Sequence, residues 1–282
     1  MGEGPVAASG PVVGSNTLID ESGLPRHEAV RLLLTASGLE PLGLLAVDGI
    51  DPDTAAAFRE LVKRRRQDEP LQYLEGSVQF GPLELIADSR ALIPRPETEQ
   101  LWELAVGAVG AGQPRVVVDL CTGSGNLALA LKHEFRRAKV YGTDDSPEAL
   151  SLAAENEVLT GLEVEWCAGD LFAALPGDLR RKVDLLVANP PYLAEAEAAA
   201  LPTDVREHEP RRALIAGPRG DETVKRIAEG AADWLIPGGI IACEISEFQQ
   251  ESIARMFRRY AGKVLSDLTG RPRFVIGRLP AT

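Results

Sequence analysis

The segment Asn189-Pro190-Pro191-Tyr192 combines residue types that could hold a flat, nitrogen-bearing group. A carboxamide nitrogen carries two hydrogens and is a poor nucleophile, because its lone pair is delocalised into the carbonyl. The Asn189 side-chain oxygen and the Pro190 carbonyl could each accept one of these hydrogens and so orient the lone pair. Two successive prolines fix φ at about -65°, which holds that carbonyl in place, and Tyr192 offers an aromatic wall. The segment is therefore a candidate site for alkylating an amide or amine nitrogen, with positioning as the main source of rate.

The same tetrad has a simpler interpretation, because Asn-Pro-Pro is a common loop signal. Its context argues for chemistry. It directly follows the apolar run Val183–Ala188, which is typical of a buried strand, and it lies downstream of a glycine-rich turn. Polar groups that converge at one edge of a sheet are the usual form of an active site.

That turn, Cys121-Thr122-Gly123-Ser124-Gly125, follows the apolar run Val116–Leu120 and precedes a helical pattern. Glycine permits positive φ and lets a ligand approach the backbone closely. Such a turn could serve NAD, FAD or S-adenosylmethionine, or could only reverse the chain. A dinucleotide needs a G-x-G-x-x-G cradle for its pyrophosphate, and the third position here is Ala128. S-adenosylmethionine has no phosphate and needs no such cradle, so it is the cofactor we expect.

Two acids strengthen this expectation. Asp144 ends the second predicted strand and could accept hydrogen bonds from both ribose hydroxyls. Asp170 follows the third strand and could face the adenine edge, with Leu171 and Phe172 flanking the ring. Either acid could instead be a helix N-cap at a strand–helix junction. Asp119, at the end of the first strand, could organise the loop or reach the amino group of the cofactor.

The elements that position these residues alternate between buried strands and amphipathic helices from residue 115 onward, a pattern that predicts an α/β, doubly wound, mainly parallel sheet. At the end of the chain only a short turn separates two strands, so we expect them to be antiparallel. The predicted strands are Val116–Leu120, Lys139–Thr143, Glu163–Cys167, Val183–Ala188, Gly239–Glu244, Val264–Asp267 and Phe274–Arg278.

Composition and periodicity divide the chain into four segments. Residues 1–18 are rich in Gly, Ala, Ser and Pro and are predicted to be a disordered tail. Residues 19–75 carry helical patterns and form a predicted N-terminal domain, residues 76–96 a β-hairpin linker, and residues 97–282 the cofactor-binding domain. The cationic run Lys63–Arg66 ends a predicted helix, where cations are favoured, although it could also contact an acidic partner.

Charge and composition exclude several classes of protein. The net charge of -12 argues against a protein that grips a nucleic-acid backbone. The three cysteines are widely spaced and the three histidines share no ligand spacing, so we expect neither disulfides nor a metal site. No signal peptide and no apolar run of about 18 residues is evident, so we expect a cytoplasmic protein without membrane spans.

With these motifs, the chain resembles the release factor glutamine methyltransferase family. The resemblance runs from about His27 to Arg278, with Cys121 standing where the family usually has glycine. Its motifs are the Asn-Pro-Pro-Tyr tetrad, the Asp-x-x-Thr-Gly-Ser-Gly turn, Leu92-Ile93-Pro94-Arg95-Pro96-Glu97-Thr98-Glu99, Glu69-Pro70-Leu71-Gln72-Tyr73-Leu74 and Glu209-Pro210-Arg211-Arg212-Ala213-Leu214.

The resemblance implies a seven-stranded class I methyltransferase sheet behind a helical N-terminal domain that recognises the substrate. The implied substrate is the glutamine of the Gly-Gly-Gln loop of peptide chain release factors, methylated at N5 for translation termination. The segment from Asn189 to Tyr192 would hold that glutamine. Residues Cys121 to Gly125, Asp144, Leu171 and Asn189 would border the cofactor. We expect a monomer whose partners are release factors.

Two other functions stay open. The tetrad also occurs in nucleic-acid N-methyltransferases that modify adenine N6 or guanine N2, but such enzymes extrude a base and normally carry a basic groove. A non-catalytic cofactor-binding module would have a degraded site, whereas here the tetrad and both acids are present.

Overall fold

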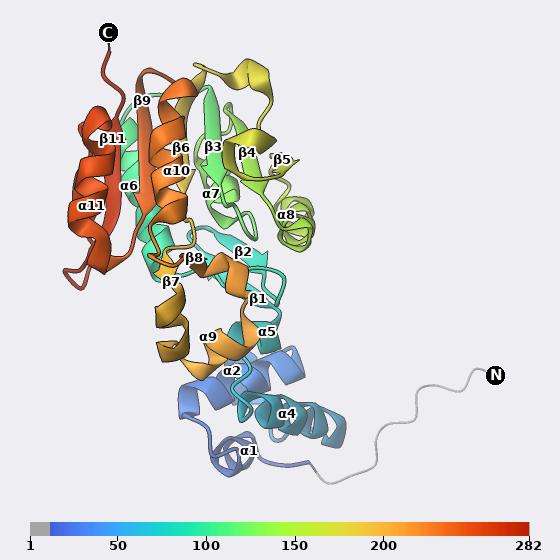
Figure 1. Cartoon of the computed structure of the whole chain (residues 1–282). Coiled ribbons are helices and arrows are strands. Elements are labelled where there is room, and N and C mark those ends of the chain that lie inside the picture. Colours follow the sequence, from blue (N-terminus) through green and yellow to red (C-terminus); the bar gives the residue numbers. More distant parts are fainter. Residues whose placement is uncertain (1–11, 282) are drawn as a thin grey trace. The chain divides into compact units, whose positions relative to one another are not determined.

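The computed structural model describes residues 12–281, which divide into two compact units. The first unit contains the described residues up to Gly76 together with Thr203–His208. The second unit contains the rest of the chain from Ser77 onward (Figure 1). Each unit has its own apolar core.

The second unit is built on a seven-stranded sheet of order β10-β11-β9-β6-β3-β4-β5. The five strands from β9 to β5 run parallel, whereas β11 pairs antiparallel with both β9 and β10. The predicted doubly wound sheet with an antiparallel C-terminal pair is confirmed. The strands are β3 (Val116–Leu120), β4 (Lys139–Asp144), β5 (Glu165–Ala168), β6 (Val183–Ala188), β9 (Leu235–Glu244), β10 (Lys263–Ser266) and β11 (Pro272–Arg278).

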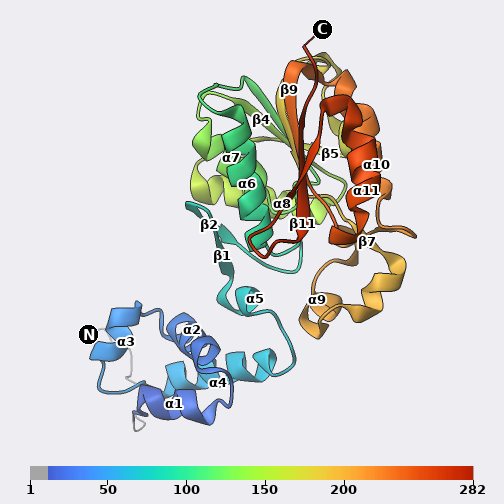
Figure 2. The same cartoon turned by 90° about the vertical axis from the view of Figure 1, so that its left-hand side faces the viewer.

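Helices cover both faces of this sheet, because side chains alternate across each strand. In β3, Val117 faces the layer formed with α6 and α7, while Val118 faces the layer formed with α10 and α11 (Figure 2). The strands β3 and β6 are therefore buried on both faces, as their near-continuous apolar runs predict. The helices of this unit are α6 (Pro96–Val109), α7 (Asn126–Glu134), α8 (Pro147–Thr160), α10 (Glu222–Gly230) and α11 (Gln250–Met256).

Smaller elements complete the second unit. The hairpin of β1 (Ser77–Phe80) and β2 (Leu83–Ile86) buries Phe80 and Leu85 in the same core as α6 and α7, so it belongs to this unit and is not a separate linker. A short parallel pair, β7 (Leu193–Ala194) and β8 (Ile215–Gly217), was not predicted. The 3₁₀ turns of the chain are η1 (Leu171–Ala174), η2 (Gly177–Leu179), η3 (Glu195–Ala200), η4 (Arg211–Ala213), η5 (Ala231–Asp233), η6 (Glu247–Gln249) and η7 (Phe257–Tyr260).

The first unit is helical, as predicted. Its helices are α1 (Ser15–Glu21), α2 (Arg26–Ser37), α3 (Pro41–Ala46), α4 (Pro52–Arg65), α5 (Leu71–Glu75) and, from a later part of the chain, α9 (Thr203–His208). The prediction of a disordered tail over residues 1–18 is wrong for residues 15–18, because Leu18 and Ile19 of α1 are buried against the other helices. Residues 1–11 of that predicted tail lie outside the described part of the chain.

The cationic side chains at the end of α4 form ion pairs and hydrogen bonds within this unit. Arg64 pairs with Glu69 at 2.5 Å, Arg65 pairs with Glu28 at 2.7 Å, and Arg66 donates to the Ser22 carbonyl. These contacts favour the structural interpretation of Lys63–Arg66 over an acidic partner. Among the described helices, none is both long and apolar enough to cross a membrane.

Candidate active site

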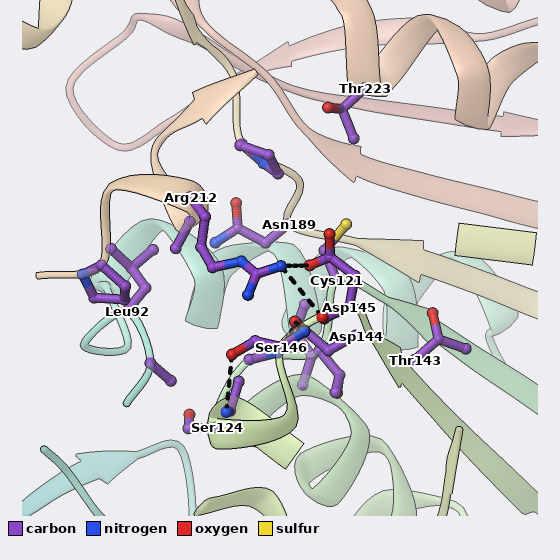
Figure 3. A pocket seen from close by; sticks show the side chains of 18 of the residues that line it. Leu92, Cys121, Ser124, Thr143, Asp144, Asp145, Ser146, Asn189, Arg212 and Thr223 are labelled. Carbon is purple, nitrogen blue, oxygen red and sulfur yellow. Dashed lines mark hydrogen bonds and ion pairs between the residues drawn. The ribbon is translucent and has the colours of Figure 1, made fainter. Parts of the chain in front are cut away.

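A cavity of about 320 Å³ lies in the second unit, at the carboxyl ends of β3, β4 and β6. Ligands of open α/β sheets bind at this edge, where the strand order reverses. Its volume is in the range of small-molecule sites, about 300–1,000 Å³. Figure 3 shows that Cys121, Asp144, Asn189 and Arg212 reach it from four separate segments.

The glycine-rich turn forms the floor of the cavity. Three of its residues have positive φ: Cys121 at 59°, Gly123 at 56° and Gly125 at 81°. A side chain on Gly125 would collide with Trp166 at 2.7 Å, so this glycine serves helix–strand packing. A Cβ on Gly123 would meet only Ala91, at 4.0 Å, so its backbone is open to a ligand. Thr122 donates its backbone N–H to the Thr143 carbonyl at 2.9 Å, which fixes the turn against β4.

Asp144 holds the turn and the start of α8 together. One carboxylate oxygen accepts from the Gly123 N–H and the other from the Ser146 N–H, both at 2.9 Å. Burial raises the pKa of Asp144, and these two N–H groups oppose the rise. The N-cap of α8 is Ser146, whose hydroxyl accepts from Ala149, so Asp144 is not the helix cap. Asp144 borders the cavity, where its carboxylate is available to a ligand.

Of the three residues after β5 that the sequence placed around the adenine ring, two line the cavity and one does not. Asp170 lines the cavity and pairs with Arg226 at 2.5 Å on an exposed edge, without capping η1. Leu171 is buried and also lines the cavity. Phe172, expected to flank the adenine ring, is not among the lining residues and stacks on Trp234, with ring centroids 5.9 Å apart. Of the two residues expected to flank the ring, Leu171 lines the cavity and Phe172 does not.

Asp119 lies beneath the turn and does not line the cavity. It is fully buried and accepts a hydrogen bond from the Thr122 hydroxyl at 2.5 Å. Burial raises its pKa to about 7. Of the two roles that the sequence left open, the geometry favours loop organisation over direct contact with the cofactor.

The tetrad follows β6 directly, and the structure divides its members. Asn189 and Pro191 line the cavity, while Pro190 is buried and Tyr192 is turned away from it. The Tyr192 hydroxyl donates to Glu244 at 3.0 Å, and burial raises the pKa of this phenol. Tyr192 therefore does not form the exposed aromatic wall that the sequence suggested, although its backbone carbonyl anchors Gln249 at 3.1 Å.

Sequence reasoning missed two buried partners of the tetrad. The Asn189 amide nitrogen donates to the Thr98 hydroxyl at 3.0 Å, and that hydroxyl donates to Glu244 at 2.9 Å. Thr98 belongs to the Ile-Pro-Arg-Pro-Glu-Thr-Glu motif, which supports the family resemblance but did not by itself predict a role for this threonine. Glu244 ends β9, and the rule that singled out Asp144, an acid at the carboxyl end of a buried strand, could have found it.

One wall of the cavity comes from the segment before α6. Glu209 pairs with Arg95 and accepts from the Ile93 N–H at 3.1 Å, which joins this segment to the one that carries Arg212. Arg212 contacts Asp145 at 2.9 Å across the cavity mouth. Among the described residues, no cluster of His, Cys, Asp and Glu could hold a metal ion.

Comparison with known proteins agrees with this geometry. A protein of Deinococcus radiodurans named release factor glutamine methyltransferase is 41% identical over 266 residues, covering 92% of this chain and 94% of its own. The protein of the same name from Mycolicibacterium smegmatis is also 41% identical, covering 89% of each chain. The chain belongs to the release factor glutamine methyltransferase family.

Two family models match separate parts of this methyltransferase, and the first of them ends at Gly76, where the first stretch of the helical unit also ends. The PrmC N-terminal domain model matches residues 14–76, and the methyltransferase small domain model matches residues 104–205. Among solved structures, a methyltransferase from Pyrococcus furiosus has a TM-score of 0.53 at 18% identity, over 71% of this chain and 90% of that one. The Thermus thermophilus 16S rRNA N2 G1207 methyltransferase, solved with AdoMet and guanosine, has a TM-score of 0.51 at 20% identity, over 72% of this chain and 49% of that one. At these identities the likeness shows the fold alone.

Proposed function

We propose that the protein transfers a methyl group from S-adenosylmethionine to the side-chain amide nitrogen, N5, of the glutamine in the Gly-Gly-Gln loop of peptide chain release factors. The observation that carries the proposal is Asn189, which lines the cavity beside the glycine-rich turn. Its amide nitrogen is already bound to Thr98, while in the described part of the chain its oxygen has no hydrogen-bond partner. The family relatives named for this substrate support the choice of glutamine.

The residues of the cavity fit S-adenosylmethionine. The backbone at Gly123 is open to a methionine moiety, the Asp144 carboxylate can accept from ribose hydroxyls, and Leu171 offers an apolar surface for adenine. When bound, the cofactor supplies an electrophilic methyl group on its sulfonium. We therefore assign Cys121, Thr122, Gly123, Ser124, Asp144, Asp170 and Leu171, which line the cavity, to the cofactor site, with Gly125 shaping the turn and Asp119 supporting it from below.

Asn189 supplies the orientation that the substrate nitrogen needs. Its side-chain oxygen accepts one hydrogen of the glutamine amide, and the Pro190 carbonyl accepts the other. The lone pair then points along the line of methyl transfer. A cofactor held by the glycine-rich turn and Asp144 would supply the methyl group by breaking its carbon–sulfur bond, while Asn189 would hold the substrate nitrogen, which would then lose one proton to solvent. No strong general base is required in this order of events.

The first unit is the part of the chain that we assign to recognition of the release factor. We further propose that the enzyme acts as a cytoplasmic monomer. We also propose that it does not bind nucleic acid directly, because its net charge of -12 disfavours contact with a phosphate backbone. The competing hypothesis is a nucleic-acid substrate, and DNA and RNA are therefore included in the assay.

Methyl transfer from labelled cofactor tests this function. The protein is incubated with a purified release factor, with the same factor carrying Gln→Glu in its Gly-Gly-Gln loop, and with DNA and RNA in parallel. We expect label in the unaltered factor alone. Label in DNA or RNA but not in the release factor would overturn the proposal in favour of base methylation.

A further inference from the structure

The hydroxyl of Thr98 lies between the Asn189 carboxamide and the Glu244 carboxylate. It is 3.0 Å from the amide nitrogen of Asn189 and 2.9 Å from one Glu244 oxygen. The other Glu244 oxygen is 3.0 Å from the Tyr192 hydroxyl. Thr98 and Glu244 are each 1% exposed, so water does not compete for these bonds.

Counting protons gives this chain of hydrogen bonds a direction. An ionised carboxylate only accepts hydrogen bonds, so both the Thr98 and the Tyr192 hydroxyls must donate to Glu244. A hydroxyl has a single proton, and Thr98 therefore has only lone pairs to offer to Asn189. Those lone pairs accept from the amide nitrogen, which leaves the carboxamide oxygen on the side away from Thr98. The opposite rotamer would place two acceptors against each other at this site.

We propose that Thr98 and Glu244 are positioning residues that hold the Asn189 carboxamide with its oxygen toward the substrate nitrogen. This inference rests on the proposed function, in which that oxygen accepts a substrate N–H. Thr98 borders the cavity, and its hydroxyl is bonded to Asn189 and Glu244, so in this arrangement it acts through Asn189 and not on the reacting atoms. In the flipped carboxamide an NH₂ group would face the substrate's own N–H donors, and the lone pair of the substrate would no longer be oriented.

The direction of the hydrogen bonds depends on the charge of Glu244. Burial raises the pKa of Glu244 to about 7, with Glu97 adding to the rise and Arg273, Thr98 and Tyr192 opposing it. Below that pH a protonated Glu244 can itself donate to Thr98, whose proton is then free to point at Asn189. The carboxamide can then adopt either orientation, so the rate of transfer should fall as the pH decreases through about 7.

The test compares Thr98→Val with Thr98→Ser in the full-length enzyme, using single-turnover methyl transfer to a release factor from about pH 6 to about pH 9. Loss of an outer hydrogen bond that orients a functional side chain costs about 10–100-fold at metal sites, and we expect a loss of similar size in the rate of Thr98→Val at about pH 8. Serine keeps the hydroxyl and should recover most of the rate. The affinities of both Thr98 variants for cofactor and release factor should stay within about threefold of the wild-type affinities, because Asn189 and the cofactor-binding residues are still present.

Two further variants make the result specific. Thr160→Val is the matched control, because the Thr160 hydroxyl bonds only to the backbone of its own helix, at the end of α8. It should behave as wild type. Glu244→Gln replaces the ionisable carboxyl with a neutral amide. The rate of methyl transfer by this variant should therefore lie below the wild-type rate at about pH 8 and should not change between about pH 6 and about pH 8.

The outcomes separate this inference from the function on which it rests. If wild type modifies the release factor, Asn189→Ala does not, and Thr98→Val matches wild type, the positioning role is wrong while the function stands. The positioning role is equally wrong if Glu244→Gln keeps the rate and pH dependence of wild type. If wild type itself fails to modify any release factor, the proposed function has failed.

Discussion

At the scale of single residues, Asp144 joins two walls of the cavity through one carboxylate. Its two oxygens accept from the turn at Gly123 and from the start of α8 at Ser146. Each oxygen keeps a further lone pair, and the carboxylate borders the cavity. The same group can therefore shape the turn and bind the ribose.

Asp144→Ala should weaken cofactor binding strongly. The loss of charge-assisted hydrogen bonds costs about 1.5–3 kcal/mol, or about one to two decades in affinity. Calorimetric titration with S-adenosylmethionine measures this. The matched control is Asp184→Ala, because Asp184 also accepts from two backbone N–H groups, at Arg115 and Val116, but at the opposite edge of the sheet. Equal cofactor affinity in wild type and Asp144→Ala would refute the assignment.

Cys121 is the residue at which this chain departs from the family pattern, and the structure shows the conformational cost. Its φ of 59° lies in the left-handed region, which costs a residue with a Cβ about 1–2 kcal/mol. Burial raises the pKa of its thiol, with Asp144 adding to the rise, so the thiol stays protonated.

We expect Cys121→Gly to keep or slightly tighten cofactor binding and to change the free energy of unfolding by less than about 1 kcal/mol. Relief of the strained φ opposes the added entropy of glycine in the unfolded chain. Cys121→Ala should show no gain in stability, because alanine keeps the Cβ. Denaturant unfolding and cofactor titration of the three proteins check this. A large loss of affinity in the glycine variant would mean that the thiol itself contributes to binding.

At the scale of elements, the ends of β3 and β9 each bury an acid next to the cavity. The pKa of Asp119 is raised to about 7 from 3.8, and that of Glu244 to about 7 from 4.5. A carboxyl whose pKa is raised on folding favours the folded state while it is protonated. Its contribution is complete below the unfolded pKa and is lost as the pH rises through the folded pKa.

Replacing Glu244 with glutamine should therefore stabilise the protein increasingly as the pH rises from about 4.5 to about 7. The difference in unfolding free energy between Glu244→Gln and wild type should grow by up to about 1.4 kcal/mol per pH unit in this window. Urea unfolding at about pH 4.5, 6 and 7.5 measures the difference. A difference that shrinks as the pH rises would contradict the buried, pKa-raised carboxyl.

The sequence predicted the central elements well and the peripheral elements poorly. Val116–Leu120 and Val183–Ala188 are strands with the predicted bounds, because burial on both faces leaves a near-continuous apolar run. The predicted strand Gly239–Glu244 begins four residues earlier in the structure, at Leu235. Short elements such as α1 and β7 have too few residues to show a period, and tertiary contacts define them.

The candidate site shows the same division. The sequence brought Asn189, Asp144 and the glycine-rich turn to one edge, because parallel strands deliver their carboxyl ends to the same place. It did not reveal that Tyr192 turns toward Glu244 or that Phe172 stacks on Trp234. The direction of a side chain after a strand depends on long-range neighbours, and no local pattern records them.

At the scale of the whole molecule, the position of the cavity in one unit and the negative net charge both fit a protein substrate. All residues that line the cavity belong to the second unit. The first unit has its own apolar core and uses the cations at the end of α4 internally. The chain as a whole carries a net charge of -12, which disfavours contact with a phosphate backbone.

The central claim is that the oxygen of Asn189 orients the substrate amide, and single-turnover methyl transfer to a release factor by Asn189→Ala tests it most directly. Cofactor affinity is measured on the same samples. We predict a rate at least about 10²-fold below wild type, the usual cost of removing one positioned polar group, with cofactor binding and folding retained. Asn189→Asp keeps an acceptor toward the substrate but cannot donate to Thr98, so it should retain more activity than the alanine variant. A rate near wild type in Asn189→Ala would contradict the account.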